Sequence, residues 1–154
     1  MSEQKQPAKR NGLSNKRRNA RQFAMQALYQ WLLAQGGLTD IELQFRTDYD
    51  MKDTDLSLFR ELLHGIPSKA GELDQHLAPR LDREIADLDP VEKSILRMGA
   101  YEMAFRLEVP YRVVINEYVE LAKTFGATDS HKYVNGVLDK IARDLRSAEA
   151  SRGK

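Results

Sequence analysis

Apolar residues recur every three or four positions through most of this chain. That spacing places them on one side of an α-helix, whereas a half-buried strand would need apolar and polar residues in alternation. The first such stripe contains Ala20, Phe23, Ala24, Ala27, Leu28, Trp31 and Ala34. No segment alternates between hairpin turns, and no internal repeat is present. The sequence therefore predicts an all-α fold, a helical bundle of six or seven helices.

Capping residues predict where the later helices begin and end. Asp89-Pro90-Val91-Glu92 combines a capping side chain, a proline at the first helical position and an acid three residues after the cap. This motif predicts a helix over Val91–Leu107. The following helix should end at Gly126, and we expect Thr128 or Asp129 to cap the last one.

Glycine and proline predict the breaks in the first half of the chain. The Gly36-Gly37 pair should end the first helix, which we expect to begin near Asn15. A short second helix should start at Asp40. Because proline removes a helical hydrogen bond and clashes with the preceding turn, Pro67 predicts a break or kink beside Gly65.

Composition and charge indicate where the chain works and what it binds. No apolar run approaches the roughly 18 residues needed to span a bilayer, and there is neither a secretory signal nor a cysteine, so we expect a cytoplasmic protein.

Residues 1–22 hold seven basic side chains against one acid, whereas residues 40–92 hold fourteen acids against six bases. We interpret residues 1–14 as a disordered basic leader before a single domain at 15–154, with a preference for an anionic partner. A solubilising tail beside solvated helix faces explains the same charges.

Known catalytic motifs are absent from the sequence. The three histidines lie too far apart for a local metal site, and neither HExxH, GxxxxGK[ST] nor GxGxxG occurs. The lack of cysteine excludes a thiolate zinc site and a cysteine nucleophile. We therefore expect a protein that is not an enzyme and needs no metal or other cofactor.

The first predicted helix combines cations with an aromatic ring on one side. At 100° per residue, Arg18, Arg21 and Tyr29 fall within about 80° of one another, opposite the apolar stripe, and Lys16 and Arg17 lie at the same end as the other cations. Guanidinium groups hold phosphates and a phenol ring stacks on an unpaired base, so this side suits single-stranded RNA. An ordinary solvated face, with Tyr29 filling a groove between helices, explains the same residues.

A second cluster is predicted where the last helix begins. Phe125 ends one helix, and Asp129, His131, Lys132 and Tyr133 open the next. The free backbone N–H groups at such a helix start attract phosphate. Asp129 can cap the helix or accept a hydrogen bond from a base amino group, and the sequence does not decide between these roles.

Three blocks of sequence carry a family signature. They are RRNARQFAMQALYQW from Arg17 to Trp31, DPVEKSILR from Asp89 to Arg97, and VPYRVVINEYVELAKTFGATDSHKYVNGVLDKIAR from Val109 to Arg143. In this order and spacing they resemble the NusB family of bacterial transcription antitermination factors. The resemblance covers nearly all of the chain after Asn15.

The resemblance implies a fold of two three-helix lobes and a protein that binds the boxA element of nascent RNA together with NusE, a small-subunit ribosomal protein. It also implies that this pair joins an antitermination complex on RNA polymerase, notably during ribosomal RNA synthesis, with NusE docked mainly on the C-terminal half. Transferred position by position, the RNA contacts would be Arg17, Arg18, Arg21, Tyr29, Glu92, Phe125, Asp129, Lys132 and Tyr133.

Two other functions fit the same pattern. A NusB-like domain also occurs attached to RNA methyltransferases, whose catalytic domain would need a nucleotide-cofactor sheet that these 154 residues do not predict. A helical protein-interaction adaptor would never contact RNA. The sequence also leaves open whether the protein is a monomer or a homodimer.

Overall fold

The computed structural model describes residues 12–152, and this range contains eight α-helices, two short 3₁₀ helices and no strand. The α-helices are α1 (Gly12–Ala34), α2 (Leu38–Asp48), α3 (Leu56–Ser68), α4 (Ala70–Leu77), α5 (Pro90–Phe105), α6 (Tyr111–Phe125), α7 (Ser130–Leu145) and α8 (Ser147–Arg152). The all-α prediction is confirmed. The helix beyond the predicted seven is α8, which has no apolar stripe in the sequence.

The predicted leader at 1–14 lies outside the described residues except for Gly12–Ser14, which form the first turn of α1. The first helix therefore begins three residues before the expected Asn15. It ends at Ala34, where the chain reverses at Gln35 with φ of 55°. No described glycine has a positive φ, so the Gly36-Gly37 pair follows the helix end without supplying the left-handed residue.

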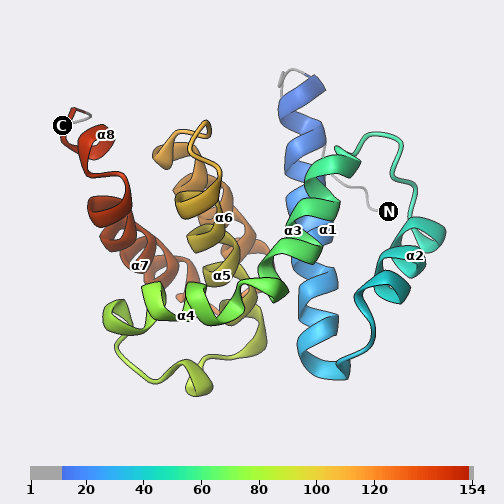
Figure 1. Ribbon diagram of the computed structural model, residues 1–154, viewed down its shortest axis with the longest axis horizontal. Helices are drawn as coiled ribbons and strands as arrows, with labels where there is room; N and C mark the ends of the chain where they lie inside the picture. The colour runs from blue at the N-terminus through green and yellow to red at the C-terminus, as the bar shows by residue number, and fades with distance from the viewer. Residues whose placement is uncertain (1–11, 153–154) are drawn as a thin grey trace.

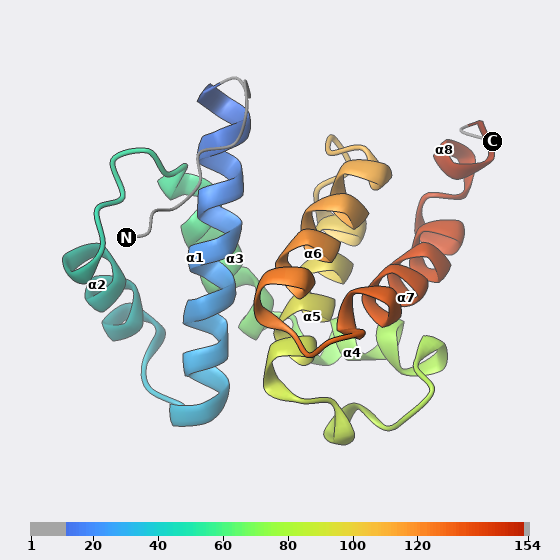
Figure 2. The same cartoon turned by 180° about the vertical axis from the view of Figure 1, so that it is seen from behind.

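The helices form two lobes (Figure 1). In the N-terminal lobe, α2 and α3 pack with α1, and in the C-terminal lobe α5 lies against α4, α6 and α7. Figure 2 shows α6 and α7 in front of α5 when the molecule is seen from behind. The N-terminal lobe has the three helices that the family resemblance implied, whereas the C-terminal lobe adds α4 and α8 to its three long helices.

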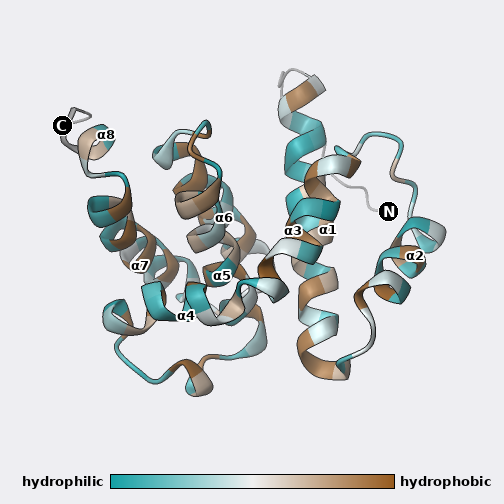
Figure 3. Cartoon of the chain, viewed as in Figure 1, coloured by the Kyte–Doolittle hydropathy of each residue, from teal (hydrophilic) through white to brown (hydrophobic). Residues whose placement is uncertain are grey.

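Small residues allow α1 and α5 to pack closely with several partners. Ala20, Ala24 and Ala27 of α1 are fully buried, because α1 contacts α3 on one side and α5 on another. On α5, a Cβ atom added at Gly99 would lie 2.7 Å from a methyl group of Leu138, so glycine here leaves room for that side chain of α7. Ile95, Leu96, Met98, Ala100 and Met103 of α5 are all fully buried. Helix α5 is therefore surrounded by other helices, and Figure 3 shows hydrophilic residues on parts of the other helices.

The predicted cap at Asp89 is confirmed, whereas the helix break expected beside Gly65 lies at Lys69. Asp89 Oδ1 accepts a hydrogen bond of 2.8 Å from the backbone N–H of Glu92. Helix α3 continues through Pro67 to Ser68, and the chain bends at Lys69, with φ of −115° and ψ of 14°. Because Pro67 lies in the last turn, its missing N–H costs the helix one bond near its end and does not interrupt it earlier.

Arg146, directly after α7, fastens the C-terminal segment to the rest of the lobe. Its guanidinium donates to the carbonyl oxygens of Met103 and Val109, both at 2.9 Å, and to those of Glu102 and Arg106 at 3.2 and 3.1 Å. These carbonyls belong to the last turn of α5 and the loop after it. Those of Glu102 and Arg106 also accept from backbone N–H groups, whereas those of Met103 and Val109 have Arg146 as their donor in the described structure, at a helix end that leaves carbonyls without a partner of its own.

The segment also reaches the start of α6. Arg146 Nη1 lies 2.7 Å from Glu149 Oε1, and Glu149 Oε2 accepts a 2.9 Å hydrogen bond from the backbone N–H of Tyr111, the first residue of α6. The end of α5 and the start of α6 are therefore both capped by residues from the C-terminal segment.

We predict that Arg146→Ala lowers the free energy of unfolding by at least about 2 kcal/mol, because the carbonyl groups of Met103 and Val109 lose their hydrogen-bond donor. Arg143→Ala is the matched control on α7, since Arg143 is exposed and pairs only with Asp139 in the described structure; it should change stability by less than about 0.5 kcal/mol. Urea unfolding at 25 °C measures both. Equal losses for the two variants would show that Arg146 does not hold the segment.

Candidate nucleic-acid interface

The predicted RNA-binding residues lie in two regions. The arginine region is the first half of α1, with Lys16, Arg17, Arg18 and Arg21. The aromatic region combines Tyr29 with residues at the start of α5, the end of α6 and the start of α7. Tyr29 lies twelve positions after Arg17 on α1, so at 1.5 Å per residue the regions are about 18 Å apart along the helix.

Arg21 is buried in the arginine region. Only 4% of its side chain is exposed, and its Nε and Nη2 donate to Glu102 Oε2 and Oε1 at 2.7 and 3.0 Å. Glu102, on α5, is fully buried and also accepts a hydrogen bond from the hydroxyl of Tyr118 on α6. Arg21 therefore joins the two lobes through a charged pair, and a contact with RNA phosphate would require this pair to break.

The electrostatics of this cluster support a stable pair. Burial by itself would lower the pKa of Arg21, but the hydrogen bond to Glu102 and the charges around it raise that pKa above its ordinary value. Burial and the charge of Glu102 raise the pKa of Tyr118 well above its usual range. Arg21 thus stays charged and Tyr118 stays protonated as a donor to Glu102.

The prediction that Arg21 lies on an exposed side of α1 is wrong. Arg21 and Met25 are both buried, because the C-terminal lobe packs over the side of α1 that the helical wheel left open. Helical spacing identifies the apolar stripe, but it cannot show that a second lobe covers the opposite side.

The other three cations of the arginine region differ in whether they form an ion pair with an acidic side chain. Arg18 forms a two-pronged pair with Glu117 of α6, with Nε–Oε1 and Nη2–Oε2 distances of 3.2 and 3.0 Å. Lys16 is exposed, and neither Lys16 nor Arg17 forms an ion pair with another described residue. Among the four, Lys16 and Arg17 are the cations best placed to meet phosphates.

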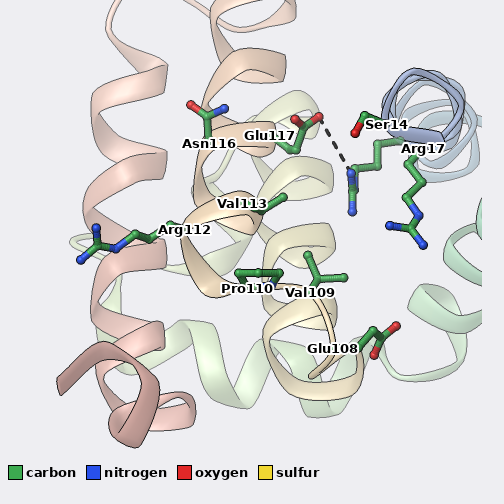
Figure 4. A pocket seen from close by; sticks show the side chains of 10 residues that line it. Ser14, Arg17, Glu108, Val109, Pro110, Arg112, Val113, Asn116 and Glu117 are labelled. Atoms are coloured by element: carbon green, nitrogen blue, oxygen red, sulfur yellow. Dashed lines mark ion pairs between the residues drawn. The ribbon is translucent and has the colours of Figure 1, made fainter. Parts of the chain in front are cut away.

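A cavity of about 450 Å³ lies between the arginine region and the start of α6 (Figure 4). Arg17 and Glu117 line it, and the buried Nε of Arg17 has no hydrogen-bond partner among the described residues. Figure 4 also shows the ion pair that Glu117 forms at this cavity. Its partner is Arg21, and the distance from Arg21 Nη1 to Glu117 Oε1 is 3.9 Å. Arg17 therefore brings to a hollow between the two lobes a guanidinium that forms no ion pair with another described residue.

The aromatic region contains a second cavity, of about 460 Å³. Tyr29 of α1 and Phe125 of α6 both line it, with Gln26 and Gln30 beside Tyr29. Tyr29 is 37% exposed, so it does not fill a groove between helices as the alternative interpretation held. The remaining walls are apolar or aromatic: Met25, Leu33, Ala34, Phe45, Tyr49 and Val91. A planar ring with polar edges fits such a cavity chemically.

Glu92 connects the starts of α5 and α7. Its carboxylate is only 9% exposed and accepts a 2.8 Å hydrogen bond from the hydroxyl of Ser130, while Arg83 Nη1 lies 4.0 Å away. Glu92 was predicted as an RNA contact, and the structure places it at the edge of the aromatic region with its oxygens already occupied. Its contacts hold the start of α7 against α5.

Asp129 and Lys132 are exposed at the start of α7 and pair with each other at 3.5 Å. Asp129 occupies the N-cap position, but its side chain accepts no hydrogen bond from the helix, so the predicted carboxylate cap is wrong. The cause is the backbone, which has φ of −108° and ψ of 15° at Asp129 in place of the extended conformation of a capping residue. Both side chains are free to reach a ligand outside the helix.

Tyr133 is half-buried and already held by two neighbours. Its hydroxyl accepts a 3.2 Å hydrogen bond from the backbone N–H of Asp82, and the guanidinium of Arg83 lies 4.4 Å from the centre of its ring. Burial raises the pKa of Tyr133, which keeps the phenol protonated at neutral pH. The sequence pattern did not indicate Arg83, because it lies in the irregular segment between α4 and α5.

Sequence reasoning also missed Glu102 and Glu117, the acids that pair with the arginine region. Glu102 had a signal, since it is a charged residue on a helix that is apolar on most sides. Several acids of the acid-rich stretch at residues 40–92 likewise form ion pairs within the protein: Glu42 with Arg60, Asp74 with Arg97 and Glu61 with Arg106.

The part of the chain that the structure describes holds no cluster of three side chains able to bind a metal ion. None of its helices is both long and apolar enough to cross a bilayer.

Comparisons with known proteins agree on one family. The model of the NusB family matches residues 18–143. The transcription antitermination protein NusB of Pseudomonas entomophila is 58% identical over 141 residues, 92% of this chain and 85% of that protein. NusB of Hahella chejuensis is 55% identical over 139 residues, 90% of this chain and 93% of that protein.

Solved structures show the same fold. NusB of T. maritima superposes with a TM-score of 0.71 at 28% identity, over 82% of this chain and 90% of the other. A structure of the antitermination factors NusB and NusE in complex with double-stranded RNA gives a TM-score of 0.71 at 26% identity, over 82% and 95% of the two chains.

We predict that Arg21→Ala destabilises the fold by about 3–5 kcal/mol, because the buried Glu102 would lose its hydrogen-bonded cation and keep only a longer contact of 3.4 Å with Arg106 Nε. Lys16→Ala on the same helix is the control and should change stability by less than about 0.5 kcal/mol. Chemical unfolding followed by circular dichroism measures both. If Arg21→Ala is as stable as the wild type and only RNA affinity falls, Arg21 acts on RNA and not on the fold.

Proposed function

This chain belongs to the NusB family of transcription antitermination proteins, a non-catalytic family, and we propose on that basis that it binds boxA RNA together with NusE. The pair would then join the antitermination complex on RNA polymerase, notably during ribosomal RNA synthesis. Such a factor acts in the bacterial cytoplasm, where nascent RNA emerges from the polymerase.

The observation that carries this proposal is the cavity between Tyr29 and Phe125. These two aromatic residues come from helices in different lobes and meet around a hollow of about 460 Å³. Sequence-specific recognition of RNA favours unpaired bases, which stack on aromatic rings and pair their polar edges with side-chain donors and acceptors. Gln26 and Gln30 provide amide groups beside Tyr29.

Phosphate contacts complete the proposed interface. Lys16 and Arg17 lie at one end of α1, and Lys132 lies exposed at the start of α7. In this arrangement the RNA backbone is held by cations while bases are read in the aromatic region, a division that is common in nucleic-acid recognition. NusE would dock mainly on the C-terminal lobe, beside the RNA.

Titration of the purified protein with boxA RNA, with and without NusE, tests the proposal. We expect preferential binding of boxA over a scrambled RNA of the same length, and tighter binding when NusE is present. Light scattering of the protein without RNA separates a monomer from a homodimer in the same samples.

Each part of the proposal has its own contrary result. Equal affinity for boxA and scrambled RNA in the presence of NusE would contradict boxA recognition. Binding of NusE with no RNA binding in either condition would favour the protein-interaction adaptor.

We predict that Tyr29→Ala weakens boxA binding by about 1–3 kcal/mol, because a base loses its stacking surface. Tyr29→Phe keeps the ring and should bind within about twofold of the wild type if stacking dominates. Fluorescence anisotropy measures affinity, and thermal unfolding confirms that both variants are folded. If Tyr29→Ala melts at a much lower temperature and its RNA affinity per folded molecule is unchanged, the ring belongs to the core.

A further inference from the structure

Arg83 lies over one face of the Tyr133 ring. The guanidinium carbon is 4.4 Å from the ring centre, a distance typical of a stacked cation and ring. Tyr133 also packs against the hydrophobic core. A base that stacked directly on Tyr133 would therefore have to displace Arg83.

Two carboxylates lie at the edges of the Arg83 guanidinium. Asp82 Oδ1 lies 2.7 Å from Arg83 Nε and Asp82 Oδ2 lies 3.3 Å from Nη2, while Glu92 Oε1 is 4.0 Å from Nη1. The backbone of Asp82 is bonded in turn to the hydroxyl of Tyr133. The plane of the guanidinium is thus fixed by contacts at its edges and on one face, although 41% of the side chain is exposed.

We propose that an RNA base stacks on the exposed face of Arg83, forming a three-layer stack of base, Arg83 and Tyr133. The inference rests on the proposed function and adds to it a recognition residue that the sequence did not identify. Arginine planes serve as stacking surfaces for unpaired bases, because the guanidinium is flat and weakly hydrated.

Stacking explains the geometry better than a phosphate contact at Arg83. A phosphate binds guanidinium N–H groups at an edge of the group, and here Asp82 occupies the Nε–Nη2 edge while Glu92 lies 4.0 Å from Nη1. A base needs only the open face. Arg83 also lies beside two residues of the aromatic region, Glu92 and Tyr133, so an RNA strand that passes the Tyr29 cavity and the start of α7 can reach it.

Arg83→Ala and Arg83→Lys test the proposal with boxA RNA in the presence of NusE. Arg83→Ala should weaken binding roughly 5-fold to 100-fold, the range found for the loss of one stacked base. Arg83→Lys keeps the charge but loses the plane, so it should lose a similar amount. Because no phosphate contact is removed, the salt dependence of binding should keep its slope in both variants.

The controls separate stacking from other causes. Arg60→Ala removes another exposed arginine that pairs with a carboxylate, Glu42 on the N-terminal lobe, and should leave affinity unchanged. Tyr133→Ala should add little further loss when made in the Arg83→Ala variant, because the two side chains act as one stack. Circular dichroism and urea unfolding confirm that each variant is folded.

Three results would overturn the proposal. Tighter binding by Arg83→Ala would mean that Arg83 blocks a base from Tyr133, and unchanged binding would mean that RNA does not reach Arg83. Wild-type affinity in Arg83→Lys, with a salt slope lowered by about 0.7 in Arg83→Ala, would assign a phosphate contact in place of a base. A wild-type protein that fails to bind boxA at all contradicts the proposed function itself, independently of the Arg83 variants.

Discussion

The buried pair between Arg21 and Glu102 determines how the two lobes meet. Arg21 belongs to the helix around which the N-terminal lobe is built, and Glu102 belongs to the central helix of the C-terminal lobe. Transferring two charges into the interior is costly, so the pair stabilises only an arrangement in which both groups are fully hydrogen-bonded. Because the cavity between Tyr29 and Phe125 has walls from both lobes, its shape depends on that arrangement.

The same pair reduces the number of cations on α1 that are available to bind RNA. Of the cations that sequence alone assigned to RNA, Arg21 neutralises Glu102 and Arg18 neutralises Glu117. Fewer charges are then available for phosphates, and affinity that depends on few phosphates is less sensitive to salt. Recognition by this protein should accordingly depend more on base contacts in the aromatic region and on a protein partner than its basic N-terminal sequence indicates.

Several contacts between distant segments hold the proposed binding surface in place. Ser130 bonds to Glu92 and thereby fixes the start of α7 against α5, and Asp82 bonds to Tyr133 from the loop before α5. At the other end of the lobe, Arg146 caps the end of α5 through its backbone carbonyls. Exposed recognition residues are thus oriented by polar groups that are themselves buried or fully bonded, which limits their motion before RNA arrives.

The sequence by itself determined the helical class, the start of α5 at Asp89, and the candidate RNA-binding residues, because helical spacing, capping and family signatures are local properties of the chain. It could not determine which of those residues are exposed. Arg21 and Tyr29 share one side of the same helix, yet the C-terminal lobe buries the first and leaves the second at the rim of a cavity. Arg83 had no local signal, and it joins the site only because the loop before α5 folds back onto Tyr133. Burial and pairing arise from contacts between segments far apart in sequence, so only the tertiary structure decided which predicted cations are free and which serve the fold.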